Sequence, residues 1–288
     1  MATRGTIRLG IAGWVFAPWR GGMFYPEGLK QKDELNYASR HLGVIEINAT
    51  FRALQKPASF RKWAAETPED FRFSVKGHQA ITHFKRLKDV DTTVASFLAS
   101  GPLALGSRLG PFVWQLPPNL KYEREKFEAF FALLPKTPDA AVALAKKHDG
   151  LKDPHLTADG IETIRHAVEV RHESFAIPEF IDLCRTNNIA VVTADTAEWP
   201  TMDATADFTY ARLQGAPGSD HYEPAEIALW AKRIDAQASG KPVPEARLVT
   251  KAEDKPRDVF ALFVSTDKEH APQNAQTVMK HLGLSPST

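Results

Sequence analysis

The chain contains 288 residues and has a formal net charge of +1 at pH 7. This balance excludes a global positive field that would gather nucleic acid or anionic lipid, so any anion site must be local. Hydrophobic residues make up 43% and charged residues 25%, which excludes disordered, collagen-like and coiled-coil proteins. The single cysteine, Cys184, excludes internal disulfides and cysteine-rich metal motifs.

The N-terminal residues lack the apolar stretch of a secretory signal, and no hydrophobic run is long enough to span a bilayer. We therefore expect a cytoplasmic protein without a membrane partner. The sequence leaves the oligomeric state open.

Short runs of β-branched and aromatic residues alternate with helical patterns, which is typical of βα units around a parallel sheet. Eight runs are predicted as strands, at 7–14, 44–51, 71–77, 111–116, 166–172, 189–195, 208–214 and 259–265. Helices are predicted at 29–42, 58–66, 90–99, 123–134, 178–187, 224–238 and 271–282. Eight strands close a (β/α)8 barrel, so we predict an α/β fold with one TIM-barrel-like domain and a core at about 7–284.

Two connections depart from the regular βα repeat. Residues 196–207 are too few for a crossover helix, so the unit between the sixth and seventh strands is predicted to lack its helix. The segment 135–163 is long and contains the alanine-rich run AAVALA, and it is predicted to be a helical insertion before the fifth strand.

Strand alternation assigns several charged side chains to the barrel interior. Successive side chains point to opposite faces of a strand, so polar residues that alternate with apolar ones face the axis. Unpaired charges there cost several kcal/mol, so each needs a partner or a ligand. The residues assigned to the interior or mouth in this way are Glu46, Asn48, Lys76, Gln115, Glu169, Arg171, Asp195 and Arg212.

These charges have a functional and a structural interpretation. Most lie toward the C-terminal ends of their strands, where active sites of this fold are built. Lys76, Arg171 and Arg212 near the mouth are suited to hold a phosphate or carboxylate. Alternatively, the charges form a salt-bridge network without chemistry, in which Glu46 is a structural member.

The loop after the first strand is unusually aromatic, and it includes Trp14, Trp19 and Tyr25. Aromatic side chains at a barrel mouth can stack on a sugar or base, or pack against the neighbouring unit. We expect packing for most of them and keep all three as candidate ligand contacts.

The sequence gives weaker support for a metal site and none for the common hydrolase and nucleotide-binding motifs. Histidines follow several predicted strands (His78, His83, His172 and His221), which leaves a metal site as an alternative, although no HExxH or similar spacing occurs. The G-x-S-x-G elbow, the P-loop and the G-x-G-x-x-G fingerprint are all absent. No cofactor is therefore predicted.

Several motifs occur in a fixed order: IAGWVFAPWRGGMFYP, EINATF, FSVKGHQAITH, LGPFVWQLPP, HAVEVRHESF, VVTADTAEWP, FTYARLQG and DVFALFVSTD. Through them the chain resembles the YecE-like family of domains of unknown function over nearly its whole length. The resemblance implies a TIM-barrel-like fold and no particular reaction. The chain departs from the family at Gln214, where His is common, and at 264–266, where Asn or Asp is common.

The leading hypothesis is a metal-independent hydrolase or lyase/isomerase that binds an anionic small molecule at the C-terminal barrel face. The ligand would carry a phosphate or carboxylate, and sugar-containing compounds are included. The alternatives are a metal-dependent nucleic-acid phosphodiesterase or repair-type barrel, and a non-catalytic binding or scaffold protein. Catalysis is assigned to Glu169, Asp195 and Lys76, and substrate binding to Arg171, Arg212, Asn48, His83, Gln115, Trp14, Trp19 and Tyr25.

Overall fold

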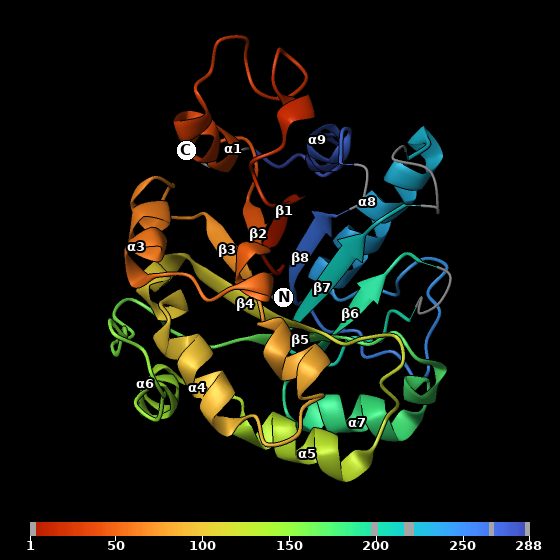
Figure 1. The fold of residues 1–288 in the computed structure, drawn as a ribbon. Helices are drawn as coiled ribbons and strands as arrows, with labels where there is room; N and C mark the ends of the chain where they lie inside the picture. Colours follow the sequence, from red (N-terminus) through yellow and green to blue (C-terminus); the bar gives the residue numbers. More distant parts are fainter. Residues whose placement is uncertain (1–3, 197–200, 216–221, 265–267, 286–288) are drawn as a thin grey trace.

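The computed structural model describes residues 4–196, 201–215, 222–264 and 268–285. Eight parallel strands form a closed barrel in sequential order, which confirms the predicted (β/α)8 fold (Figure 1). The strands are β1 (Ile7–Ala12), β2 (Val44–Ile47), β3 (Arg72–Lys76), β4 (Leu109–Gln115), β5 (His166–Glu169), β6 (Ile189–Ala194), β7 (Phe208–Leu213) and β8 (Asp258–Phe263).

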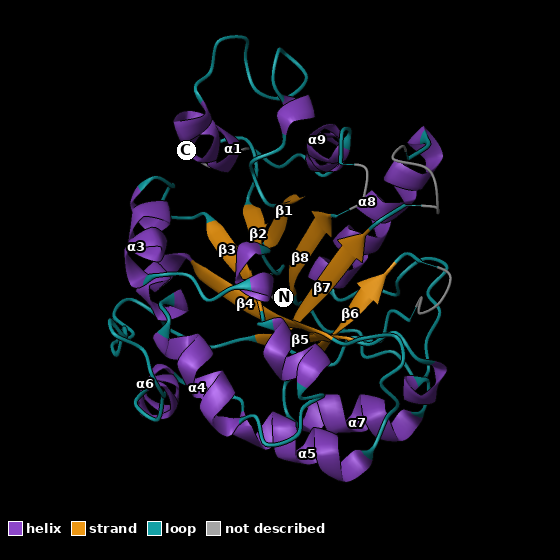
Figure 2. Cartoon of the chain, in the orientation of Figure 1, coloured by secondary structure: helices purple, strands orange, loops and turns teal. Residues whose placement is uncertain are grey.

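Helices surround the barrel on its outer face (Figure 2). They are α1 (Glu34–Ser39), α2 (Ala49–Arg52), α3 (Pro57–Ala65), α4 (Asp91–Ala99), α5 (Arg124–Leu133), α6 (Pro138–Ala145), α7 (Pro178–Thr186), α8 (Pro224–Ser239) and α9 (Ala271–His281). Proline occupies the first turn of α3, α6, α7, α8 and α9, where its missing N–H costs nothing. In α8, Glu223 and Glu226 form a capping box, and Gly240 ends the helix in the left-handed region at φ 66°.

Alternation along the strands separates two apolar clusters. One packs strand side chains such as Ile45 and Val75 against the surrounding helices, and the other fills the barrel with side chains such as Val113 and Phe260. Each fully buried aliphatic or aromatic side chain contributes about 1.5–3 kcal/mol to folding. The barrel interior is therefore a packed core below its charged upper end.

The predicted second strand is wrong beyond Ile47, because residues 49–52 form α2. The Thr50 hydroxyl lies within hydrogen-bond distance of the carbonyl oxygens of Ile47 (2.9 Å) and Lys76 (2.7 Å), which fixes this tight turn at the end of β2. The turn brings Phe51 back over the barrel mouth.

No helix joins β6 to β7 in the described part of residues 195–207, as the sequence predicts. A long loop, residues 241–257, covers this side of the barrel instead. The buried Asp203 carboxylate anchors the loop, because it accepts hydrogen bonds from the backbone N–H groups of Val249 (2.7 Å) and Thr250 (3.0 Å). Within the predicted insertion 135–163, the structure forms α6, which packs outside α4 (Figure 1).

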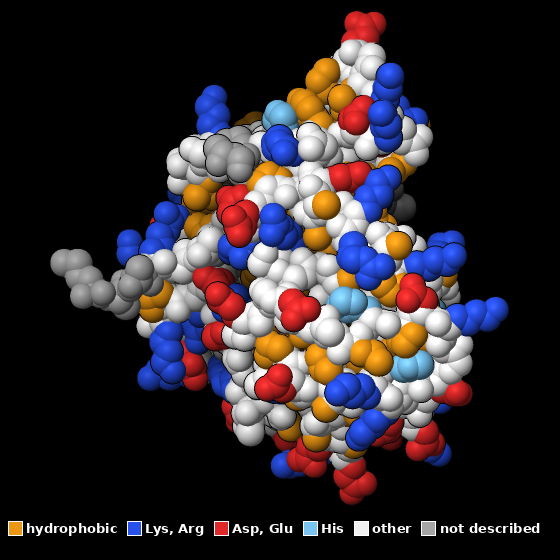
Figure 3. All heavy atoms as spheres, turned by 90° about the vertical axis from the view of Figure 1, so that its left-hand side faces the viewer, with side chains coloured by type: hydrophobic (Ala, Val, Ile, Leu, Met, Phe, Trp, Pro, Cys, Tyr) orange, Lys and Arg blue, Asp and Glu red, His pale blue; other side chains and the backbone are white. Residues whose placement is uncertain are grey.

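The described helices include none with the length and hydrophobicity required to cross a membrane. On the side that carries α3 and α6, basic and acidic side chains are interspersed (Figure 3). This face agrees with the near-zero net charge of the chain.

Candidate functional site

A charged inner layer closes the upper end of the barrel. Arg212 of β7 donates to Glu46 of β2 through Nε (3.1 Å) and Nη2 (2.9 Å), and to Glu169 of β5 through Nη1. All three side chains are almost completely buried. Because each guanidinium nitrogen donates to a carboxylate, Arg212 has little capacity left for a ligand.

Glu169 is also saturated by its neighbours. Its Oε1 accepts from Gln115 Nε2 at 2.9 Å and from Arg171 Nε and Nη2 at 2.8 and 2.6 Å. Burial alone would raise the pKa of Glu169, but Arg212 and Arg171 outweigh burial and lower it to about 2. The carboxylate therefore stays ionised near neutral pH. This inner layer, Glu46, Glu169 and Arg212, is the salt-bridge network of the structural interpretation.

Above the inner layer, Lys76 lies at the C-terminal end of β3 and is 9% exposed. Its ammonium stands 4.5 Å from the centroid of the Phe51 ring, and no hydrogen bond or ion pair of Nζ is found within the described residues. Burial, followed by the charge of Arg212, lowers the pKa of Lys76 to about 8. Lys76 is thus a buried amine that lacks the carboxylate partner given to Arg212.

Asn48 and His83 lie beside Lys76. Asn48 is one residue beyond the pairing of Ile47 with Val75, so it is next to Lys76, and its buried Oδ1 has no hydrogen-bond partner in the described structure. His83 belongs to a π-helical turn, Ala80–Phe84, of a kind frequent at functional sites, and its ring packs edge-on against Phe51 at 5.0 Å. Burial and the charge of Lys76 lower the pKa of His83.

Sequence reasoning missed Lys268. This residue follows β8, and its Nζ donates to the Ala12 carbonyl at 3.1 Å. Burial lowers the pKa of Lys268. The charge of Glu46 raises this pKa and the charge of Arg212 lowers it, so the ammonium interacts electrostatically with the inner layer. Its position just after the last strand, at the same end of the barrel as Lys76, was an available signal. Together we call Asn48, Lys76, His83, Arg171 and Lys268 the rim.

Asp195 lies apart from these residues. Its carboxylate accepts from the backbone N–H groups of Gln214 (2.7 Å) and Gly215 (3.1 Å) and from the Tyr222 hydroxyl, so it braces the end of β7. The expected inward phase of β6 is wrong, because Val192 faces the barrel core and Val191 the helices. Both faces of β6 are apolar, so alternation carried no signal there.

The first-loop aromatics pack rather than line the mouth. Trp19 and Tyr25 are 0% and 1% exposed, with the indole donating to the Lys268 carbonyl (2.6 Å) and the phenol to that of Trp14 (2.5 Å). The half-buried Trp14 ring contacts Trp63 edge-on at 5.3 Å. This is the packing that we expected for most of them, and we leave all three out of the proposed site.

Within the described ranges, no three His, Cys, Asp or Glu side chains are grouped to hold a metal ion. His221 and residues 265–266 lie outside those ranges, so the metal alternative and part of the departure at 264–266 are not tested by the structure.

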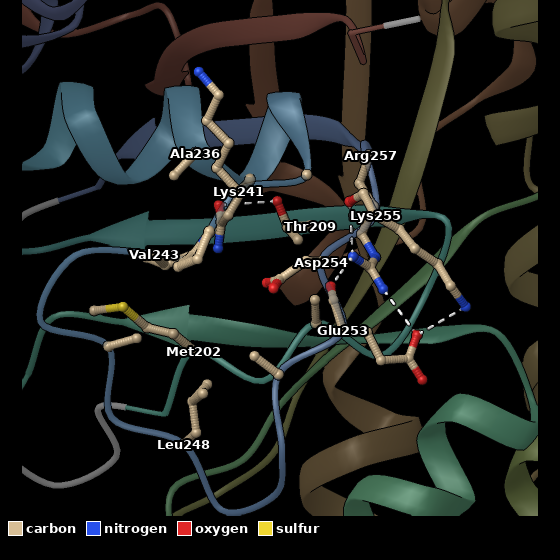
Figure 4. A pocket seen from close by; sticks show the side chains of 16 residues that line it. Met202, Thr209, Ala236, Lys241, Val243, Leu248, Glu253, Asp254, Lys255 and Arg257 are labelled. Atoms are coloured by element: carbon tan, nitrogen blue, oxygen red, sulfur yellow. Dashed lines mark hydrogen bonds and ion pairs between the residues drawn. The ribbon is translucent and has the colours of Figure 1, made fainter. Parts of the chain in front are cut away.

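Figure 4 shows a largely apolar cavity, and none of its lining residues belongs to the rim. It encloses about 190 Å³ between β7, the end of α8 and the loop 241–257, with Met202, Val243 and Leu248 on its wall. Its buried Arg257 donates to the Ala206 carbonyl (2.9 Å) and to Glu253 (3.1 Å). Arg257, the buried cation of this cavity, is thus already paired, so we assign the site to the rim.

The fold and site define a (β/α)8-barrel protein with a cationic rim above a buried ion-pair layer. The chain belongs to the DUF72 family, whose model, described as "Protein of unknown function DUF72", matches residues 8–288. This membership confirms the resemblance to the YecE-like family.

Curated relatives match over part of their length. The chain is 28% identical over 124 residues to UPF0759 protein YunF of Bacillus subtilis, covering 41% of this chain and 43% of YunF. It is 35% identical over 112 residues to UPF0759 protein YecE of Escherichia coli K12, covering 38% of each. The alignments thus span about two fifths of either relative.

Solved structures of the family match the whole barrel. A DUF72 family protein of Thermotoga maritima MSB8 has a TM-score of 0.71 at 22% identity, over 96% of this chain and 99% of its own. A DUF72 family protein of Enterococcus faecalis V583 has a TM-score of 0.65 at 18% identity, over 97% and 96%. At such identities the likeness shows the shared fold alone.

Proposed function

We propose that the protein is a metal-independent enzyme that binds an anionic small molecule, carrying a phosphate or carboxylate, at the rim. The proposal rests on one contrast: the charged groups of the inner layer have all their hydrogen-bond partners, whereas, in the described part of the chain, those of the rim do not. Arg212 is fully engaged by carboxylates, whereas Asn48 Oδ1 is buried without a partner and Lys76, at the neighbouring strand position, has no ion pair among the described residues. Buried polar groups are normally satisfied, so the unpaired Asn48 Oδ1 beside a cation that lacks an ion pair in the described structure supports a ligand at the rim.

Charge at the mouth supports an anion. Lys76, Arg171, Arg212 and Lys268 face the two carboxylates of Glu46 and Glu169, which leaves an excess of positive charge. The Arg171 side chain is 34% exposed, so its guanidinium is accessible from solvent while it donates to Glu169. Arg171 therefore forms the entrance, and Lys76 lies deeper.

The geometry favours a different distribution of roles from the sequence-based one. Glu169 keeps its negative charge and Asp195 braces backbone, so neither is placed to move a proton. The pKa of Lys76 is lowered to about 8 and that of His83 is lowered from its usual value, so each side chain is neutral more often than an ordinary residue of its type. In the proposal these two transfer protons, Arg171 and Lys268 attract the anion, and Asn48 orients the substrate.

Titration calorimetry with inorganic phosphate tests the proposal. Arg171→Gln should weaken binding at least about tenfold, since it removes a charged contact worth about 1.5–3 kcal/mol. Arg124→Gln, on α5 and paired with Glu128 in solvent, is the control and should bind as the wild type does. EDTA-treated protein should bind equally well. Equal affinity of the wild type and Arg171→Gln would contradict the rim as the site.

The nucleic-acid alternative predicts a different response. Duplex or single-stranded DNA would bind with an affinity that falls steeply with salt, because phosphate contacts release counterions. Such a titration, together with a loss of binding on EDTA treatment, would favour the metal-dependent phosphodiesterase over the proposed enzyme.

A further inference from the structure

The placement of Lys76 resembles that of a nucleophile more than that of a simple anion-binding residue. Its stem is buried at the end of β3, and its amine lies against the Phe51 ring rather than against a carboxylate. Arg212, a member of the inner layer, is paired with the acid Glu46, whereas Lys76 has no acid paired with it among the described residues. The Lys76 amine therefore has an aromatic ring on one side and, within the described part of the chain, no ion pair on the other.

From this geometry we infer that Lys76 forms a Schiff base with the carbonyl carbon of an anionic aldehyde or ketone. The inference rests on the proposed function, because the anion of the same substrate would be held by Arg171 and Lys268. It narrows the reaction to lyase or isomerase chemistry that proceeds through an iminium.

The protonation state of Lys76 suits this step. With a pKa of about 8, roughly one amine in ten is neutral at pH 7, whereas an ordinary lysine is neutral in well under one in a thousand. The cause is burial first and the positive charge of Arg212 second. Desolvation beside another cation is a known way to activate a lysine amine.

The step is balanced with the substrate and water alone. The neutral Nζ adds to the carbonyl carbon, and one proton moves from the nitrogen to the former carbonyl oxygen, which becomes the hydroxyl of a carbinolamine. One proton taken up from water lets that hydroxyl leave as water, and the nitrogen lone pair forms the C=N bond of the protonated iminium. Hydrolysis reverses these steps and returns the free amine. No oxidant, reductant or metal takes part.

Two rim residues have suitable positions for these proton movements. Asn48 Oδ1, next to Lys76 and without a partner in the described structure, can accept a hydrogen bond from the carbinolamine hydroxyl. The His83 ring bonds to the Thr82 hydroxyl through Nδ1 (2.8 Å), which leaves Nε2 to give or take a proton. Neither residue is covalently changed.

Lys136 is a matched control within the same chain. Burial lowers its pKa to about 8 as well, and its Nζ is buried without a hydrogen-bond partner in the described structure. It precedes α6 and lies near Cys184 and His166, outside the rim. A low pKa alone would make both lysines reactive, whereas a substrate-binding rim selects Lys76.

Reductive trapping tests the inference. The full chain is incubated with dihydroxyacetone phosphate or pyruvate and then with borohydride, and intact mass and peptide mapping locate the secondary amine. We expect one adduct per chain on the peptide that contains Lys76, with either probe or both. Inorganic phosphate should protect it, and the labelling rate should rise with pH through about 8. Lys136→Met should be labelled like the wild type.

Variants separate the nucleophile from the charge. Lys76→Arg keeps the positive charge, so phosphate affinity should stay within about threefold of the wild type while the adduct disappears. Phosphate binding without any Lys76 adduct would overturn the Schiff base and leave the proposed function standing. Absence of both would overturn both, and an adduct that persists in Lys76→Arg would place the reactive amine elsewhere.

Discussion

Both ends of the barrel carry charged side chains, but the two ends differ in how many of these side chains have hydrogen-bond or ion-pair partners. At the N-terminal end, which we call the floor, Arg165 pairs with Asp258 (2.7 Å) and Asp207 (3.0 Å), and Arg72 donates to the carbonyls of Glu69 (3.0 Å) and Phe71 (2.9 Å). A cavity of about 280 Å³ opens there. At the C-terminal end, the inner layer is saturated, while above it Asn48 Oδ1 has no hydrogen-bond partner and Lys76 has no ion pair among the described residues.

This difference teaches how to separate structural from functional charge in a barrel. A cavity lined with arginines is not in itself a site, because Arg72 and the two terminal nitrogens of Arg165 already have acceptors, and of their buried nitrogens only Arg165 Nε lacks one among the described residues. Unsatisfied groups next to each other are more informative, since each would otherwise cost about 1–3 kcal/mol of desolvation. Three substitutions, one in each environment, test the comparison.

The largest effect is expected in the inner layer. Arg212→Met removes the cation that Glu46 and Glu169 share and leaves two buried carboxylates with fewer donors. Breaking a buried ion pair from one side costs about 3–5 kcal/mol of unfolding free energy. Urea denaturation at pH 7 measures this. A cost below about 1 kcal/mol would show that the inner layer does not hold the barrel together.

A smaller effect is expected at the floor. The Arg165 side chain is 23% exposed and its partner Asp258 is 26% exposed, so solvent can replace part of what the substitution removes. Arg165→Gln should therefore lower the unfolding free energy by about 1–2 kcal/mol, and raising the salt concentration should reduce the difference from the wild type. A loss as large as that of Arg212→Met would remove the distinction between the two ends.

The barrel was predictable from sequence because eight β-branched runs and their intervening helices are local patterns. Alternation also assigned Glu46 and Lys76 to the interior, since apolar residues flank them on the same strands. Alternation could not show that all the guanidinium nitrogens of Arg212 bond to Glu46 and Glu169. It predicts which face of a strand a side chain points to, but not which residue it contacts. Lys268 was missed because it lies in a loop, where no periodicity applies.

The same limit explains the assignments of Trp19 and Asp195. The composition of the first loop is compatible with both a stacking platform and a packed plug, and only the burial of Trp19 separates the two. Asp195 ends a strand that is apolar on both faces, so its bonds to the backbone of Gln214 and Gly215 had no signature in the sequence.

The smallest change in unfolding free energy at pH 7 is expected for a substitution of Lys76 at the rim. Unlike the other two substitutions, it should not lower the stability. Folding lowers the pKa of Lys76 from 10.5 to about 8, so between these values the unfolded chain binds more protons than the folded one. Unfolding free energy due to this group therefore rises with pH from about 8 to 10.5, and it is lowest below pH 8, where both states are charged.

Lys76→Met isolates this contribution, because every other titrating group remains. At pH 7 the variant should be at least as stable as the wild type, since it removes a buried, unpaired ammonium and keeps an apolar stem of similar length. Between pH 7 and pH 10 the wild type should gain about 2–3 kcal/mol relative to Lys76→Met in urea denaturation. A constant difference across this range would mean that Lys76 keeps an ordinary pKa, and a loss of several kcal/mol at pH 7 would make it a structural residue like Arg212. Retained stability together with lost phosphate binding is the combination that separates a rim built for a ligand from one built for the fold.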